Sequence, residues 1–109
     1  MPTIYKVLGN INPAAVTATT LYTVPSATDA VISTVTVCNQ ASTAGTFRLA
    51  VRPAGAALAA SHYVAYDTPI AANDTIALTL GITVDATDVI TAYASSANMS
   101  FLAFGSEIS

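Results

Sequence analysis

Two stretches of the chain alternate between large apolar side chains and smaller or polar ones. In Thr46–Arg52 every second residue is large and apolar, and Thr75–Leu80 repeats the pattern. A period of two is typical of β-strands that bury one face. Runs of this kind, separated by clusters of turn-forming residues, predict about eight short strands. They span approximately Tyr5–Gly9, Thr20–Val24, Val31–Asn39, Thr46–Pro53, His62–Asp67, Thr75–Leu80, Val89–Ser95 and Met99–Phe104.

These strands are regularly spaced, and no stretch combines helical periodicity with a cap at each end. The nearest is Ala54–Ala60, a run of small residues that predicts one helical turn or a loop. The arrangement is typical of an all-β fold, and we predict a single antiparallel β-sandwich or jelly-roll-like domain over residues 1–109. This length is usual for one domain, and we find no linker or internal repeat.

Two of the predicted strands, Val31–Asn39 and Met99–Phe104, carry apolar residues on both alternations. A two-layer sandwich has no core for a second apolar face, so a partner or an overlying loop must cover it. We therefore expect one of these strands to lie at a subunit contact. The candidate interface residues on them are Val31, Ile32, Val35, Met99, Leu102 and Phe104.

Charged residues are rare: they make up 8% of the chain, against about 25% in an ordinary soluble domain, while apolar residues make up 53%. Two interpretations fit. The chain is either a small domain coated with Thr, Ser and Asn, or a protein whose surface is largely covered by its own copies or by a larger assembly, because interface cores are depleted in charge. With three basic residues and a net charge of −3, it lacks the basic surface that nucleic acid requires.

We expect no membrane partner, because polar residues interrupt every apolar run before it reaches the length of a spanning helix. The N-terminal residues contain no basic stretch leading into an apolar one, so we also expect no signal peptide. Cys38 is the only cysteine, which excludes an intrachain disulfide and is compatible with assembly in a reducing cytosol.

Two arginines, Arg48 and Arg52, share the polar face of one predicted strand and account for two of the three cations in the chain. Such positions are commonly solvated. The functional interpretation is that both arginines pair with carboxylates of a partner or of a sister chain, and this adds them to the candidate interface residues.

Catalytic chemistry is sparse. Ser61, His62 and Asp67 are the residue types of a hydrolase triad, but no glycine-flanked nucleophile elbow surrounds the serine. Three aspartates, Asp74, Asp85 and Asp88, lie in predicted turns. Their side chains are explained by hydrogen bonds to backbone N–H groups of those turns, and the alternative is that they bind a structural metal ion. We expect no enzymatic activity, no catalytic residue, no cofactor and no metal site.

Several segments resemble small virion structural proteins of tailed bacteriophages, particularly phages of cyanobacteria. The first three are LYTVP (Leu21–Pro25), VISTVTVCN (Val31–Asn39) and TFRLAVRPAG (Thr46–Gly55). The resemblance continues through AYDTPIAANDT (Ala65–Thr75), LGITVDATDVI (Leu80–Ile90) and FGSEI (Phe104–Ile108). It thus covers nearly the whole chain from Leu21 onward.

This resemblance implies a β-sandwich without catalytic residues that is present in many copies on the particle. It implies a capsid cement (decoration) protein, which binds the major capsid protein and stabilises the assembled head. We accordingly expect a location on the outer surface of the virion after assembly in the host cytoplasm. We also expect a homo-oligomer, with a trimer favoured over a dimer, because closed symmetry would cover the surplus apolar faces.

The main alternative is a tail, baseplate or fibre component of a phage virion, including a module that binds a receptor or a glycan. Such a module needs an exposed aromatic cluster with an open groove, for which Tyr63 and Tyr66 are the nearest candidates.

Overall fold

The structure, a computed structural model, describes residues 3–109 and contains nine β-strands and two 3₁₀ turns in that range. The strands are β1 (Thr3–Ile11), β2 (Thr19–Thr23), β3 (Asp29–Asn39), β4 (Gly45–Arg52), β5 (Tyr63–Ile70), β6 (Thr75–Leu78), β7 (Ile82–Val84), β8 (Val89–Ala94) and β9 (Met99–Ile108). The 3₁₀ turns, η1 (Pro53–Gly55) and η2 (Ala60–His62), both lie in the connection between β4 and β5.

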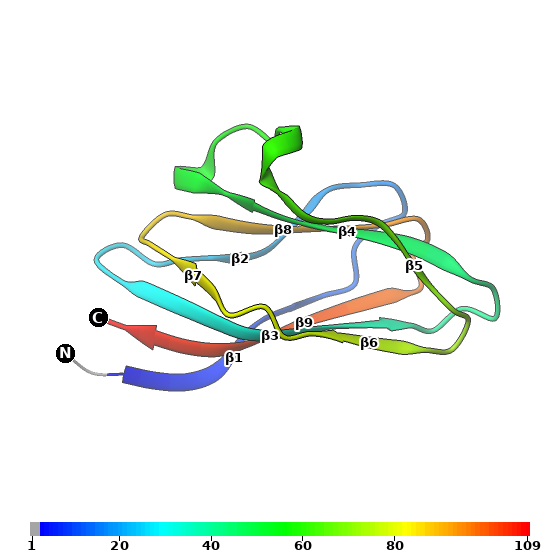
Figure 1. The fold of residues 1–109 in the computed structure, drawn as a ribbon, viewed down its shortest axis with the longest axis horizontal. Helices are drawn as coiled ribbons and strands as arrows, with labels where there is room; N and C mark the ends of the chain where they lie inside the picture. The colour runs from blue at the N-terminus through cyan, green and yellow to red at the C-terminus, as the bar shows by residue number, and fades with distance from the viewer. Residues whose placement is uncertain (1–2) are drawn as a thin grey trace.

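These strands form two antiparallel sheets that pack face to face as a β-sandwich (Figure 1). The five-stranded sheet has the order β1-β9-β3-β6, with β7 also paired to β3, and the four-stranded sheet has the order β2-β8-β4-β5. Both sheets contribute to the core. Phe47 of β4 and Phe101 of β9 are fully buried there and meet edge to face, with 6.2 Å between ring centroids. The all-β sandwich that the sequence predicts is confirmed.

A β-bulge explains why Val31–Asn39 carries apolar residues on both alternations. The register of β3 against β9 shifts between Ile32 and Thr34. Ile32 is buried before the shift and Val35 is buried after it, so the inward alternation changes from even to odd residue numbers at Ser33. Much of the apparent second apolar face is therefore core on the other side of the bulge, and it needs no partner to cover it.

The connection between β4 and β5 covers part of the outer face of the four-stranded sheet. By their register Ala50, Val89 and Thr91 point away from the core, yet all three are buried. The segment that contains η1 and η2 lies above them, with η1 against β8 and η2 against β4 (Figure 1). An overlying loop thus shields apolar surface, although on other strands than the two that the sequence singles out.

Three elements differ from the sequence prediction. The sequence predicts a single strand over Thr75–Leu80, but Gly81, whose φ is 62°, turns the chain, and β7 then pairs with β3. β5 continues through Pro69. Proline has no backbone N–H to donate, and an edge strand tolerates this because one of its sides has no neighbouring strand. The small-residue run Ala54–Ala60 is a loop with a 3₁₀ turn at each end.

Candidate functional site

The outer face of the five-stranded sheet has a shallow hollow of about 610 Å³. We call it the β1–β9 hollow; its lining residues are Tyr5, Lys6, Val7, Val31, Ser33, Phe104, Gly105 and Ser106. Tyr5 and Val7 are 82% and 48% exposed, and Phe104 lies opposite Val7 in the register of β1 and β9. Aromatic and aliphatic side chains from three neighbouring strands therefore face outward together.

Backbone forms part of this surface, because Gly105 allows β9 to approach β3 closely at the bulge. A Cβ atom at residue 105 would lie well inside 3.0 Å of the Val31 carbonyl oxygen. Gly105 is paired with Ile32, directly before the register shift. Any larger residue would push the two strands apart, so the glycine is required by the bulge.

The β1–β9 hollow has almost no charge. Among its lining residues, all of which lie within the described range, only Lys6 is charged, and its Nζ atom lies 3.0 Å from a carboxylate oxygen of Glu107. The same carboxylate accepts a hydrogen bond of 2.5 Å from the hydroxyl of Tyr22, which belongs to the other sheet. This network neutralises the lysine and ties the end of β9 to β2.

The network also shifts two pKa values. The hydrogen bond from Tyr22, followed by the hydrogen bond and charge of Lys6, lowers the pKa of Glu107 below its usual value, although burial acts in the opposite direction. Burial, followed by the hydrogen bond to Glu107 and its charge, raises the pKa of Tyr22 above its usual value. Both shifts favour the observed state, an ionised glutamate that accepts a hydrogen bond from a neutral tyrosine.

Replacing Glu107 with glutamine should destabilise the fold by about 1 kcal/mol near neutral pH, because a hydrogen bond to a charged group is lost together with a partly exposed ion pair. The lowered pKa of Glu107 means that the ionised carboxylate stabilises the folded state above the usual glutamate pKa of 4.5. This contribution is lost as the pH falls through the lower pKa of the folded state. Urea unfolding of the wild type and Glu107→Gln at pH 7 and pH 3 measures the difference.

We expect the difference in unfolding free energy between the two proteins to shrink towards zero at the lower pH. The pairwise comparison cancels the titration of the other carboxylates. An equal difference at both pH values would contradict the role assigned to Glu107.

The residues that the sequence groups as a candidate interface lie in three places. Ile32, Val35 and Met99 are in the core, at most 1% exposed, so a partner cannot contact them and we leave them out of the candidate surface. Three more, Val31, Leu102 and Phe104, lie on the outer face of the five-stranded sheet. The last two, Arg48 and Arg52, lie on the outer face of the four-stranded sheet.

Arg48 makes its contacts within the chain. Its Nε and Nη2 atoms donate hydrogen bonds of 2.7 Å and 3.3 Å to the two carboxylate oxygens of Asp67. The guanidinium also lies between two rings, 4.2 Å from the centroid of Tyr66 and 4.3 Å from that of Tyr93. The bonds to Asp67 raise the pKa of Arg48 above its usual value, so the group stays charged and its partner is already in place. The Nε atom of Arg52 is buried without a hydrogen-bond partner in the described part of the chain.

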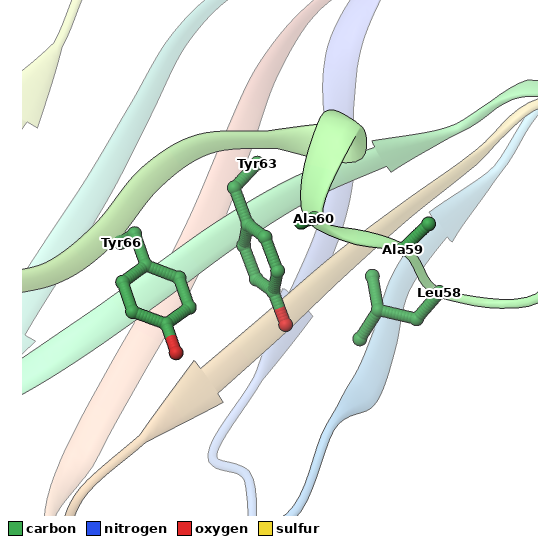
Figure 2. Close-up of a pocket in the computed structure, with 5 residues that line it drawn as sticks. All are labelled: Leu58, Ala59, Ala60, Tyr63 and Tyr66. Atoms are coloured by element: carbon green, nitrogen blue, oxygen red, sulfur yellow. The ribbon is translucent and has the colours of Figure 1, made fainter.

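A second hollow, of about 570 Å³, lies beside this arginine cluster. We call it the tyrosine hollow; Leu58, Ala59 and Ala60 of the β4–β5 connection line it together with Tyr63 and Tyr66 of β5. Figure 2 shows the two tyrosine rings side by side, with Leu58 beyond Tyr63. Tyr66 is exposed and Tyr63 is half-buried, so the hollow presents part of an aromatic pair to solvent.

The triad residue types are engaged elsewhere. The Nδ1 atom of His62 accepts a hydrogen bond from the Ala59 backbone N–H, and Asp67 holds Arg48. Asp74, Asp85 and Asp88 accept hydrogen bonds from backbone N–H groups of their own turns. Residues 3–109 contain no group of three or more potential metal ligands, and no helix in this range is long and apolar enough to span a membrane.

No protein-family model matches the chain, and no curated protein shows significant sequence similarity to it.

Proposed function

We propose that this protein is a non-catalytic structural component of a phage virion, a capsid decoration protein that binds the shell of the major capsid protein. The proposal is supported by the resemblance to virion proteins of tailed phages and by the scarcity of charge in the chain. It is further supported by the β1–β9 hollow, which supplies a surface on which such binding can occur.

The β1–β9 hollow is the observation that carries the proposal. Tyr5 is 82% exposed and lies next to Val7 and Phe104, and a group of exposed apolar side chains on one face marks a surface that binds a partner. Charged residues are depleted at the cores of protein interfaces, while aromatic residues are enriched. The hollow combines both properties, and the pairing of Lys6 with Glu107 leaves no free charge to desolvate.

A decoration protein stabilises a shell by mass action. If the chain binds the assembled shell and not the free capsid subunit, each bound copy shifts the equilibrium towards the assembled form. We expect the chain to act as a homo-oligomer, with a trimer favoured over a dimer, so that one closed unit bridges several capsid subunits. The flat outer face of a sheet suits such contacts, because it presents several strands at once.

Sedimentation with particles tests the proposal. Purified protein is added to undecorated heads of the phage that encodes it, and the heads are pelleted through a density gradient. We expect the protein to sediment with the heads and to raise the temperature at which they rupture. If the protein stays at the top of the gradient even when it is added in large molar excess over the capsid subunits, the proposal is wrong.

A further inference from the structure

The tyrosine hollow is built from two separate parts of the chain. Tyr63 and Tyr66 come from the edge strand β5, while Leu58 and its neighbours come from the segment that connects β4 to β5. Its volume of about 570 Å³ lies within the range of about 300–1,000 Å³ that is typical of small-molecule sites. Tyr66 is 57% exposed and Leu58 is 36% exposed, so a ligand can reach both from solvent.

The aromatic side chains of the hollow are held in place before any ligand arrives. Tyr63 and Tyr66 meet edge to face, with 4.9 Å between ring centroids and 81° between ring planes. Arg48 stacks on the ring of Tyr66, and Asp67 fixes the guanidinium from the side. The opposite wall is held by the hydrogen bond from the Ala59 N–H to His62. A rigid aromatic site loses little conformational entropy when it binds a ligand.

The charges around the hollow favour a neutral ligand. Arg48 stacks on Tyr66, and two of its three guanidinium nitrogens already donate to the carboxylate of Asp67. An anionic ligand would have to compete with that carboxylate for the guanidinium, and a cationic ligand would approach Arg48 itself. Neither exchange is favourable, because a bidentate arginine–carboxylate pair is among the stronger polar contacts in a protein.

The polar groups favour a ligand with hydroxyls. The side chain of Asp67 remains 45% exposed beside Tyr66, and a carboxylate has acceptor sites beyond the two that Arg48 uses. In Figure 2 the hydroxyls of Tyr63 and Tyr66 lie on the same side of the hollow, where each can donate or accept. A pyranose ring has apolar C–H faces that stack on aromatic rings and hydroxyls at its edge that reach such groups.

We propose that the tyrosine hollow binds a neutral saccharide, with the sugar ring against Tyr63 and Tyr66 and its hydroxyls directed to the phenol groups and to Asp67. On a virion surface this site would attach the particle weakly to neutral glycans, and many copies would add to the avidity. The inference is independent of the proposed attachment to the shell, because the β1–β9 hollow lies on the opposite sheet.

Saturation-transfer difference NMR tests the site, using the full chain with four neutral probes: maltotriose, a galactobiose, a mannobiose and chitotriose. A galacturonic acid dimer serves as the anionic probe and a proline-rich peptide as the non-sugar probe. We expect saturation transfer to at least one neutral sugar, and weaker transfer to the other two probes. No transfer to any of the neutral sugars, or stronger transfer to the uronic acid or the peptide, would overturn the proposal.

A matched pair of variants locates the binding. Tyr66→Ala should weaken the affinity at least tenfold, because the stacking surface is lost. Tyr5→Ala makes the same change at an exposed tyrosine on the other sheet and should leave the affinity unchanged. If Tyr66→Ala does not fold, Leu58→Ser, in the connection outside both sheets, replaces it with the same expectation. Equal affinities for the Tyr66 or Leu58 variant and the wild type would contradict the assignment.

The two proposals fail separately in these experiments. Tyr66→Ala should still sediment with heads, since its change lies away from the β1–β9 hollow. A wild-type chain that sediments with heads and binds none of the sugars would refute the saccharide site and leave the decoration proposal standing.

Discussion

Replacing Phe104 with aspartate should abolish attachment to phage heads while leaving the chain folded. Phe104 is partly exposed on the outer face of β9, and it lies between Val7 and Thr34 of the neighbouring strands. In the proposed complex the aspartate would remove an aromatic contact and bury an unpaired charge. Together these effects should cost about 3 kcal/mol of binding free energy, which corresponds to about a hundredfold loss of affinity.

A charge on the other sheet provides the control for this variant. Thr20 is exposed on the outer face of β2, and Thr20→Asp adds the same charge without touching the β1–β9 hollow. It should sediment with heads like the wild type. Circular dichroism and thermal unfolding establish that both variants are folded. Full occupancy of heads by a folded Phe104→Asp protein would show that the hollow is not the contact surface.

Phe101→Ala should have the opposite profile, with a large loss of stability. Phe101 lies on the same strand as Phe104 but on the inward alternation, where it is fully buried against Phe47. Truncation leaves a cavity in the core, and such changes cost about 3–5 kcal/mol. For a domain of this size the melting temperature should fall by more than about 10 °C. Denaturant unfolding followed by circular dichroism measures the loss.

Phe104→Ala is the matched control, because the same residue type is truncated three positions along the strand. Its side chain is only partly buried, so its loss should cost about 1 kcal/mol. If Phe101→Ala proves too unstable to purify, Phe101→Leu should show a reduced loss of about 1 kcal/mol with the same direction. Equal losses for Phe101→Ala and Phe104→Ala would contradict the assignment of the two residues to opposite faces of β9.

Much of the fold follows from the alternation of side chains. Strands with strict alternation, such as Thr46–Arg52, fall where the pattern places them, because one buried face dictates the period. The bulge at Ser33 could not be predicted, since it depends on how β9 pairs with β3 and on the absence of a side chain at Gly105. For this reason the pattern of Val31–Asn39 indicates two apolar faces, although most of its large apolar residues point into the core between the two sheets.

Part of the candidate sites can be located from the sequence. Phe104 and Arg48 stand out in the pattern, and they lie on the outer faces of the two sheets. The contacts of Arg48 with Tyr66, Tyr93 and Asp67 do not follow from the sequence, because these neighbours come from two other strands and meet only when the register is known. Tyr5 and Val7 do not stand out either, because their exposure depends on β1 being an edge strand.

The number of copies per virion tests the central claim most directly. Quantitative mass spectrometry of purified particles gives the ratio of this protein to the major capsid protein. A decoration protein should be present at one copy per capsid subunit, as when a trimer occupies every three-fold axis between capsid subunits, or at a simple fraction of that number. A ratio of a few per cent would contradict the proposal and place the protein in the tail, baseplate or fibres, where the β1–β9 hollow would contact other components.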